Sequence, residues 1–313
     1  MKYIARRILT ALVTLWLVTL ITFLLLRVMP GNPAMVIVGT EGSAEAVAAI
    51  EAQLGLNRSL LAQYVDWLGD VVRGDLGASF RYERPVSRLI WERMPVTLSL
   101  TVLAMVIALS IAVPLGVLAA LRHNSLADYL VLVFAQLGLA VPFFWLGILA
   151  ILLFALKLGW LPTGGYAGWD TGPLAVLRHL LLPSATLAMV LLAVLTRMTR
   201  SSVLDVLHQD YIRTARAKGL STQTVLLHHT LKNALLPVVT VAGLQIANLL
   251  AGSVVVEQVF SLPGLGRLVL FAVGHRDWPL IQGLVLFIAG LVVIINLLVD
   301  LLYRYLDPRI SLA

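Results

Sequence analysis

The sequence has no cysteine and little charge. Only 12% of its 313 residues are charged and 60% are hydrophobic, whereas about 25% are charged in an ordinary soluble domain. The lack of cysteine excludes disulfides, thiolate catalysis and cysteine-ligated metals. The scarcity of charge excludes a water-soluble globule, because too little polar material is present to cover its surface. Lipid must therefore be the solvent for much of this chain.

The sequence also lacks motifs for catalysis and nucleotide binding. No G-x-x-x-x-G-K-[ST] loop occurs, so this chain has nothing to cradle ATP phosphates. No His-Glu-x-x-His motif occurs, and the six histidines are scattered. The adjacent His228 and His229 would point about 100° apart on a helix, which favours polar residues at an interface over a metal pair. We therefore expect no enzymatic activity, no cofactor and no metal site in this chain.

Long uncharged runs are the main feature that the sequence does have. A helix that crosses a bilayer needs about 20 apolar residues. Six runs are long enough: Ile8–Leu26, Met94–Leu121, Tyr129–Leu156, His179–Thr196, Asn233–Val256 and Trp278–Val299. They lack the period-2 alternation of barrel strands. The sequence therefore predicts an all-α polytopic membrane protein with six transmembrane helices, and Pro114 and Pro142 predict kinks in the second and third.

The basic residues predict the orientation of these helices. A net charge of +7 could suggest nucleic-acid binding, but its distribution argues for membrane topology instead. With the N-terminus inside, twelve basic residues lie in the cytoplasm and four lie in short external loops, in keeping with the positive-inside rule. We predict that both termini are cytoplasmic and that the first span is not cleaved, since no A-x-A site follows it. No nucleic-acid partner is expected.

The external connection, Val28–Arg93, predicts small helices separated by glycines. Ser43 can cap a helix that Gly55 stops, and Ser59 can cap another that ends near Gly74. The second of these helices has one apolar face: Leu60, Leu61, Tyr64, Trp67, Leu68 and Val71. We interpret this segment as a cap packed on the external ends of the spans, which is compatible with a docking surface for a soluble partner.

The internal connection, Arg197–Lys232, has a helix, glycine, helix pattern. Apolar residues at four-residue spacing predict one amphipathic helix: Val203, Leu207, Tyr211 and Ala215. Lys218 suits its last turn, Gly219 suits a left-handed position after it, and Ser221 can cap a second helix. Such a stiff unit favours an element that transmits motion between proteins, and an inert interfacial helix is the alternative.

Four polar residues in or beside the predicted spans are candidates for a transport path: Gln136, Gln245, Asn248 and Glu257. Such side chains are costly in lipid and tend to face other helices or a water-filled cavity. For the three amides, the alternative role is hydrogen bonding between helices. Glu257, at the outer end of the fifth span, is either an interface anchor or part of an outer gate.

At the internal connection the sequence resembles a known family. Residues 211–220 (YIRTARAKGL), followed by 231–237 (LKNALLP), resemble the cytoplasmic coupling loop of inner-membrane permeases of ABC importers, of the dipeptide, oligopeptide and nickel type. Further stretches agree in the same order: Met29–Pro33, Gly74–Gly77, Leu262–Arg267, Arg276–Gln282 and Leu306–Arg309. The chain departs from the pattern at Arg213-Thr214-Ala215, where the general importer has Glu-Ala-Ala, and at Asn32, where aspartate is more usual.

The resemblance implies a type I ABC importer transmembrane fold in a bacterial or archaeal inner membrane. It implies that ATP and Mg are held by two separate ATPase subunits, together with a second, similar permease chain and an external substrate-binding protein. The ATPase-coupling residues would be Tyr211, Arg213, Ala215, Arg216, Ala217 and Gly219. The chain would comprise an anchor span (1–28), an external helical loop (29–93), a permease core (94–304) with a coupling loop (198–232), and a cytoplasmic tail (305–313). The spans of the core would lie near 94–121, 129–156, 179–197, 233–256 and 278–300.

Peptide is the cargo that the resemblance favours, and nickel or a metal chelate is the alternative. A stand-alone secondary transporter or channel is a different possibility, but ion coupling usually places acidic side chains near the membrane midplane. No Asp or Glu falls inside the six runs, which disfavours that class. A membrane-embedded enzyme would need clustered His, Asp, Glu or Ser near one interface, and the sequence has no such cluster.

Overall fold

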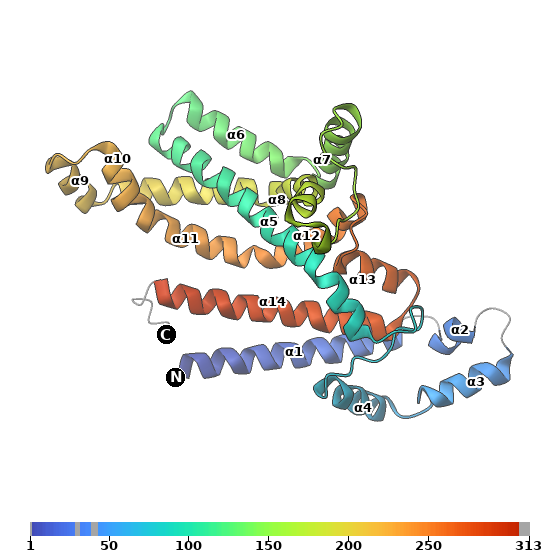
Figure 1. Cartoon of the computed structure of the whole chain (residues 1–313). Helices are drawn as coiled ribbons and strands as arrows, with labels where there is room; N and C mark the ends of the chain where they lie inside the picture. The colour runs from blue at the N-terminus through green and yellow to red at the C-terminus, as the bar shows by residue number, and fades with distance from the viewer. Residues whose placement is uncertain (1, 29–31, 39–42, 307–313) are drawn as a thin grey trace. The chain divides into compact units, whose positions relative to one another are not determined.

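The structure is a computed structural model, and it describes residues 2–28, 32–38 and 43–306. These residues form helices and connecting loops, and the only strand-like pairing among them is an isolated bridge between Ala78 and Pro85 (Figure 1). The chain forms two compact units: residues 1–95 with 267–297, and residues 96–266 with 298–313. Most of the predicted tail and of the Met29–Pro33 motif lies outside the described residues.

The first unit contains all or most of six helices: α1 (Lys2–Val28), α2 (Pro33–Val38), α3 (Ala44–Gln53), α4 (Leu60–Val72), α13 (Leu265–Gly274) and α14 (Trp278–Leu306). The predicted caps of its small helices are confirmed. The hydroxyl of Ser43 accepts a bond from the Ala46 N–H at 3.2 Å, and that of Ser59 accepts one from the Ala62 N–H at 3.4 Å. The glycines that follow these helices, Gly55 and Gly74, have positive φ, as their stop positions require.

Helix α4 packs against α1 through part of its predicted apolar face. Tyr64 is buried, its ring lies 5.3 Å from that of Phe23, and its hydroxyl lies 2.9 Å from that of Thr19. Leu60 and Leu61, however, are exposed. The predicted apolar face therefore includes two residues that are not packed. Leu60 and Leu61 lie in the first turn of α4, and α1 contacts the turns that follow.

The second unit is built around one long helix. It contains the rest of α5 (Val86–Leu121), together with α6 (Leu126–Ala140), α7 (Phe143–Ala150), the π-helical η1 (Ile151–Lys157), the short η2 (Trp169–Thr171), α8 (Pro173–Leu207), α9 (Asp210–Ala217), α10 (Thr222–Thr224), the π-helical η3 (Val225–Thr230), α11 (Leu231–Leu244) and α12 (Ile246–Val259). Helix α8 contacts α6, α7, α11 and α12. Its leucines fill the core, which also takes in a row of alanines from α5.

Helices α5 and α8 approach each other closely at Gly116. A Cβ at this position would lie 2.6 Å from the Cβ of Thr199 and 2.7 Å from the carbonyl oxygen of Thr196. Small residues let membrane helices meet in this way, since van der Waals contact rather than the hydrophobic effect holds them together in lipid. A larger residue than glycine at position 116 would therefore push the two helices apart.

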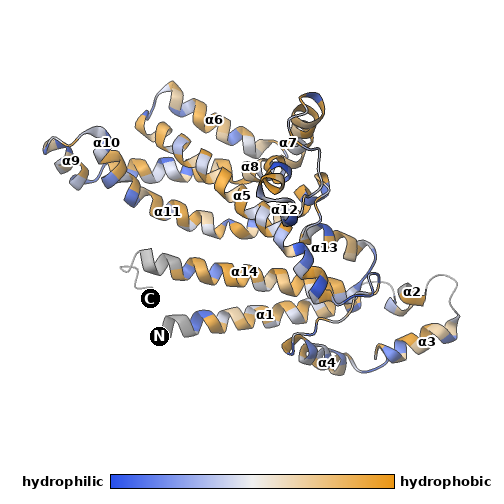
Figure 2. Ribbon diagram, viewed as in Figure 1, coloured by the Kyte–Doolittle hydropathy of each residue, from blue (hydrophilic) through white to orange (hydrophobic). Residues whose placement is uncertain are grey.

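Among the described residues, five helices are long and apolar enough to cross a membrane, and a sixth span results if one bent pair is counted. Figure 2 shows hydrophobic residues along the long helices. The bent pair is 126–138 with 143–157, which turns by 93°. Pro142 lies at the break. Proline breaks a helix because it lacks a backbone N–H and disfavours helical backbone in the residue before it. The kink predicted at Pro142 is confirmed, whereas α5 continues as one helix through Pro114.

The fourth and fifth predicted spans differ most in extent from the helices. The fourth span was expected at 179–197, but α8 runs from Pro173 to Leu207. The fifth was expected as one helix, but it divides at Gln245 into α11 and α12, and its first part continues an unbroken helical segment that starts at Thr222. Composition could not show either difference, because a helix can continue beyond an apolar run wherever its polar side chains find partners.

Candidate functional site

The internal connection contains a separate short helix, α9, where the sequence predicted a single longer helix. Helix α8 ends at Leu207, Gln209 has extended backbone (φ −71°, ψ 146°), and α9 begins at Asp210. The prediction of one helix from Val203 to Ala215 is therefore wrong. Asp210 in the first turn suits the positive end of the helix dipole, and the break gives α9 a direction of its own (Figure 1).

Helix α9 buries one side and exposes the other. Ile212 and Ala215 are buried and pack with Val225. Tyr211, which the spacing had placed on the apolar face, is 43% exposed. Of the six residues predicted to couple to an ATPase, Ala215 is thus a buried anchor, and the other five are exposed: Tyr211, Arg213, Arg216, Ala217 and Gly219.

Gly219 makes the turn that follows α9. Its φ is +79°, and a Cβ added to it would meet nothing within 4 Å. The requirement for glycine is therefore conformational and not steric. The Gly219 N–H donates to the Arg216 carbonyl at 3.0 Å, and the hydroxyl of Ser221 accepts from the Thr224 N–H at 3.2 Å. The predicted helix, glycine, helix pattern is confirmed.

The second helix of this pattern is the start of the fifth span and not a separate short helix. It runs without a break from Thr222 to Leu244, so the turn at Gly219 leads directly into a candidate span. The side chain of Asn233 donates to the Tyr211 hydroxyl at 2.9 Å and ties this helix to α9. Helix α9 is therefore joined to the predicted membrane region by a continuous helix and by a side-chain hydrogen bond.

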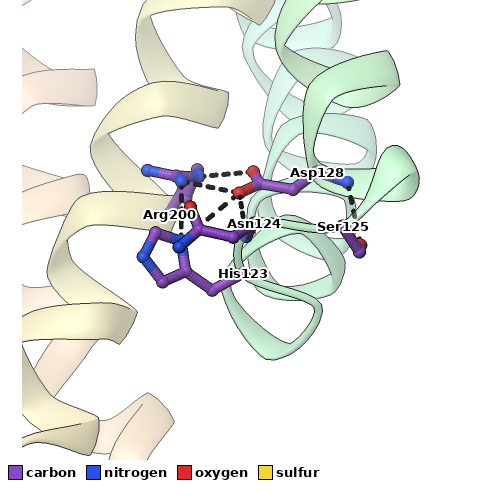
Figure 3. Close-up of polar contacts among 5 residues, drawn as sticks. All are labelled: His123, Asn124, Ser125, Asp128 and Arg200. Carbon is purple, nitrogen blue, oxygen red and sulfur yellow. Dashed lines mark hydrogen bonds and ion pairs between the residues drawn. The ribbon is translucent and has the colours of Figure 1, made fainter.

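A buried ion pair ties α8 to the first turn of α6 (Figure 3). The carboxylate of Asp128 is 1% exposed and accepts from Nε and Nη2 of Arg200 at 2.6 and 2.7 Å. The backbone N–H of Asn124 donates to it at 3.0 Å, and His123 Nδ1 lies 3.4 Å away. Arg200 lies seven residues before the end of α8, so this pair anchors the helix that leads into α9. Sequence reasoning missed it, because the two residues are far apart in the chain.

Replacing Arg200 by methionine should lower the stability of the chain. The change leaves a buried carboxylate without its cation, which costs about 3–5 kcal/mol. Thermal unfolding in detergent measures the effect. The control is Arg197→Met, an exposed arginine one turn away on the same helix, and Asp128→Asn combined with Arg200→Met should recover part of the loss. Equal melting temperatures for Arg197→Met and Arg200→Met would contradict the anchoring role.

The four candidate path residues do not form one cluster of contacts. Gln136 is exposed on α6. Gln245 lies at the break between α11 and α12, and its side-chain oxygen accepts from Asn248 at 2.5 Å. Glu257 is fully buried. The structure therefore brings Gln245 and Asn248 together, and it places Glu257 in a packed site.

Glu257 holds the segment before α13 in place. The hydroxyl of Thr97 donates to the Glu257 carboxylate at 2.6 Å and accepts from the Leu265 N–H at 2.8 Å. A Cβ on Gly264 would lie 2.3 Å from this carboxylate, and one on Gly266 would lie 2.5 Å from the Cα of Val254. The two glycines of the L-P-G-L-G-R motif are thus needed for close packing, which favours the anchor role of Glu257 over the gate.

Asp277 makes a second buried carboxylate site that sequence reasoning missed. It is fully buried in the first unit and accepts from the Ser79 hydroxyl at 2.5 Å and from the backbone N–H groups of Phe80 and Arg81 at 3.2 Å. It also accepts from the Leu280 N–H at 3.3 Å, as an N-cap of α14 does. The sequence could have indicated the N-cap role, because Asp277 stands directly before the long apolar run that starts at Trp278. The loop that follows Gly77 is thus joined to the family-like segment at the start of α14.

Comparison with known proteins identifies the family. The model for the inner membrane component of binding-protein-dependent transport systems matches residues 112–312, and the model for the N-terminal part of these membrane components matches residues 1–101. The chain belongs to this family. It is an ABC transporter permease, and the resemblance found in its sequence is confirmed.

Several relatives match the permease over nearly its whole length. A putative peptide transport system permease protein of Brucella suis is 46% identical over 307 residues, which cover 98% of each chain. An oligopeptide transport system permease protein of Bacillus subtilis is 44% identical, and a glutathione transport system permease protein of Escherichia coli is 43% identical, each covering 99% of both chains.

A solved structure confirms the fold. A chain of the inward-facing MetNI methionine ABC transporter superposes with a TM-score of 0.58 at 19% identity, covering 70% of this chain and 96% of that one. The predicted type I ABC importer transmembrane fold is therefore correct.

Proposed function

We propose that this permease forms half of the translocation path of a peptide importer and that α9 couples it to a partner ATPase. The observation that carries the proposal is the continuous connection from the exposed face of α9, through Gly219, into the helix 222–244. Helix α9 is exposed on one side and anchored by Ile212 and Ala215, so a movement of the bound ATPase can displace it. The unbroken helix 222–244 can transmit this displacement into the membrane. The peptide cargo is supported by the names of the relatives.

The exposed face of α9 has the character of a docking surface. Arg213, Arg216 and Lys218 are exposed around it, and the apolar side chains of Tyr211 and Leu220 are 43% and 40% exposed beside them. A basic face with apolar side chains suits a partner whose groove carries acidic residues. The proposed complex contains this chain, a second permease chain, two ATPase subunits that hold ATP and Mg, and an external binding protein.

Uptake in a reconstituted system tests this function. With its partner permease, ATPase subunits and binding protein in vesicles, the chain should support ATP-dependent uptake of a radiolabelled dipeptide and no uptake of radioactive nickel. Uptake should stop when the ATPase subunits are left out. Nickel uptake without peptide uptake would favour the metal-chelate alternative, and uptake by the isolated chain would favour a stand-alone transporter.

The proposed orientation puts α9 in the cytoplasm and the caps of α3 and α4 outside. Because the chain has no cysteine, single cysteines can report this directly. Ser59→Cys and Gln209→Cys, both at exposed positions, should be labelled by an impermeant thiol reagent from opposite sides of the membrane. Labelling of both from the same side would contradict the topology.

A further inference from the structure

The first unit contains a cavity of about 730 Å³, with charged and polar side chains in its wall, that the proposed coupling through α9 does not use. It lies among the end of α1, helix α4, the loop after Gly77 and the start of α14. The side chains that matter for its chemistry are Arg27, Gln63, Trp67, Asp70, Glu83 and Trp278. Its volume falls within the range of about 300–1,000 Å³ typical of small-molecule sites.

Arg27 supplies a cation that is stacked but not paired. Its guanidinium carbon lies 5.0 Å from the ring centroids of Phe23 and Trp278. Among the described residues no carboxylate pairs with it, and its side chain is half-buried. A guanidinium partly removed from water and held against aromatic rings favours a carboxylate or phosphate as its partner. This end of the cavity therefore suits an anionic group.

Gln63 supplies an acceptor that has no donor. The residue is 9% exposed, and its side-chain nitrogen donates to the carbonyls of Leu56 and Arg58 at 3.1 and 2.8 Å. These two bonds fix the amide orientation, because only the NH₂ group can donate to carbonyls. Its Oε1 is buried and has no partner among the described residues. A buried acceptor left unpaired is costly, so this atom suits an N–H donor.

Two carboxylates on the cavity wall remain available to a cation. Asp66 also lines the cavity, but it is paired with Arg58. Asp70 has only a long, exposed contact to Arg73 at 3.8 Å, and Glu83 forms no ion pair among the described residues. The cavity thus offers a guanidinium, an amide acceptor, carboxylates and two tryptophan rings.

We propose that this cavity binds a free di- or tripeptide as a zwitterion. Arg27 would donate to the peptide's carboxylate, Gln63 Oε1 would accept from a peptide N–H, and Asp70 and Glu83 would face its ammonium group. The inference rests on the proposed peptide import and adds a site on the permease itself at which a peptide is held outside the spans. A phospholipid headgroup shares the anionic chemistry, and the experiment below separates the two.

The test uses the complete importer in phosphatidylcholine nanodiscs and a dipeptide with a photoreactive diazirine side chain. Mass spectrometry of the labelled fragments gives the result. The free dipeptide should label the segments that line the cavity, and its C-terminal amide should label them about tenfold less, since a hydrogen-bonded charge pair is worth about 1.5–3 kcal/mol. Arg27→Gln should match that loss, and Gln63→Leu and N-acetylation of the dipeptide should reduce labelling too.

The matched control is Arg88→Gln, which removes an exposed arginine of the first unit that neither lines the cavity nor pairs with its carboxylates, and it should leave labelling unchanged. An unlabelled cavity in an importer that still takes up the dipeptide would overturn the site and leave the proposed function standing. Loss of labelling when phosphatidylglycerol is added would identify a headgroup site and overturn the peptide assignment. An importer that takes up no peptide would refute both proposals.

Discussion

Gly219→Val is expected to abolish most ATP-driven uptake while the permease still folds and inserts. A side chain with a Cβ at a φ of +79° is strained by about 1 kcal/mol or more, and valine is among the least tolerant residues there. The turn would shift and α9 would lose its alignment with the helix 222–244. The spans should be unaffected, because the turn is exposed and contributes little to their packing.

Uptake and ATP hydrolysis in reconstituted vesicles measure this effect together. The control is Gln223→Ala, an exposed residue four positions further along the chain, which should transport normally. Gly219→Val should lower uptake per ATP hydrolysed several-fold, or lower hydrolysis because the ATPase docks poorly. Unchanged uptake at an unchanged ATP cost would show that the turn is a passive tether.

Gly266→Ala is expected to destabilise the second unit. The added Cβ would lie 2.5 Å from the Cα of Val254, and backbone cannot move aside as a flexible side chain can. Overpacking of this kind costs about 1–3 kcal/mol. The segment would also separate from the Glu257 carboxylate that Thr97 holds, so we expect a lower melting temperature in detergent.

Gly274→Ala provides a matched control for this substitution. Gly274 belongs to the same helix, α13, and a Cβ there would meet nothing within 4 Å. This variant should be neutral or slightly more stable, because alanine favours a helix over glycine by about 1 kcal/mol. If both variants melt at the wild-type temperature, the close approach at Gly266 does not limit stability.

The features that could be predicted from the sequence are local. Ser43, Ser59 and Ser221 cap helices as expected, and Gly219 takes its left-handed position, because caps and turns depend on residues a few positions apart. The apolar runs located the spans because a helix that crosses a bilayer needs a continuous stretch of about 20 apolar residues. The kink at Pro142 follows from the geometry of proline itself.

The features that could not be predicted depend on distant contacts. Thr97 and Glu257, Asp128 and Arg200, and Ser79 and Asp277 are each brought together by the fold. The break before α9 was also missed, since the spacing of Val203, Leu207, Tyr211 and Ala215 fits one helix as well as two. Only the backbone at Gln209 shows that Ile212, and not Tyr211, faces the core.

Crosslinking from α9 tests the central claim, that this helix contacts the ATPase, most directly. Ala217→Cys, the one cysteine in the permease, would carry a thiol-linked benzophenone in the complete importer and be irradiated. We predict that the adduct joins the permease to an ATPase subunit and that the same probe at Ser59→Cys gives no such adduct. An ATPase adduct from Ser59 but not from Ala217, or from neither position in a complex that transports, would contradict the coupling role of α9.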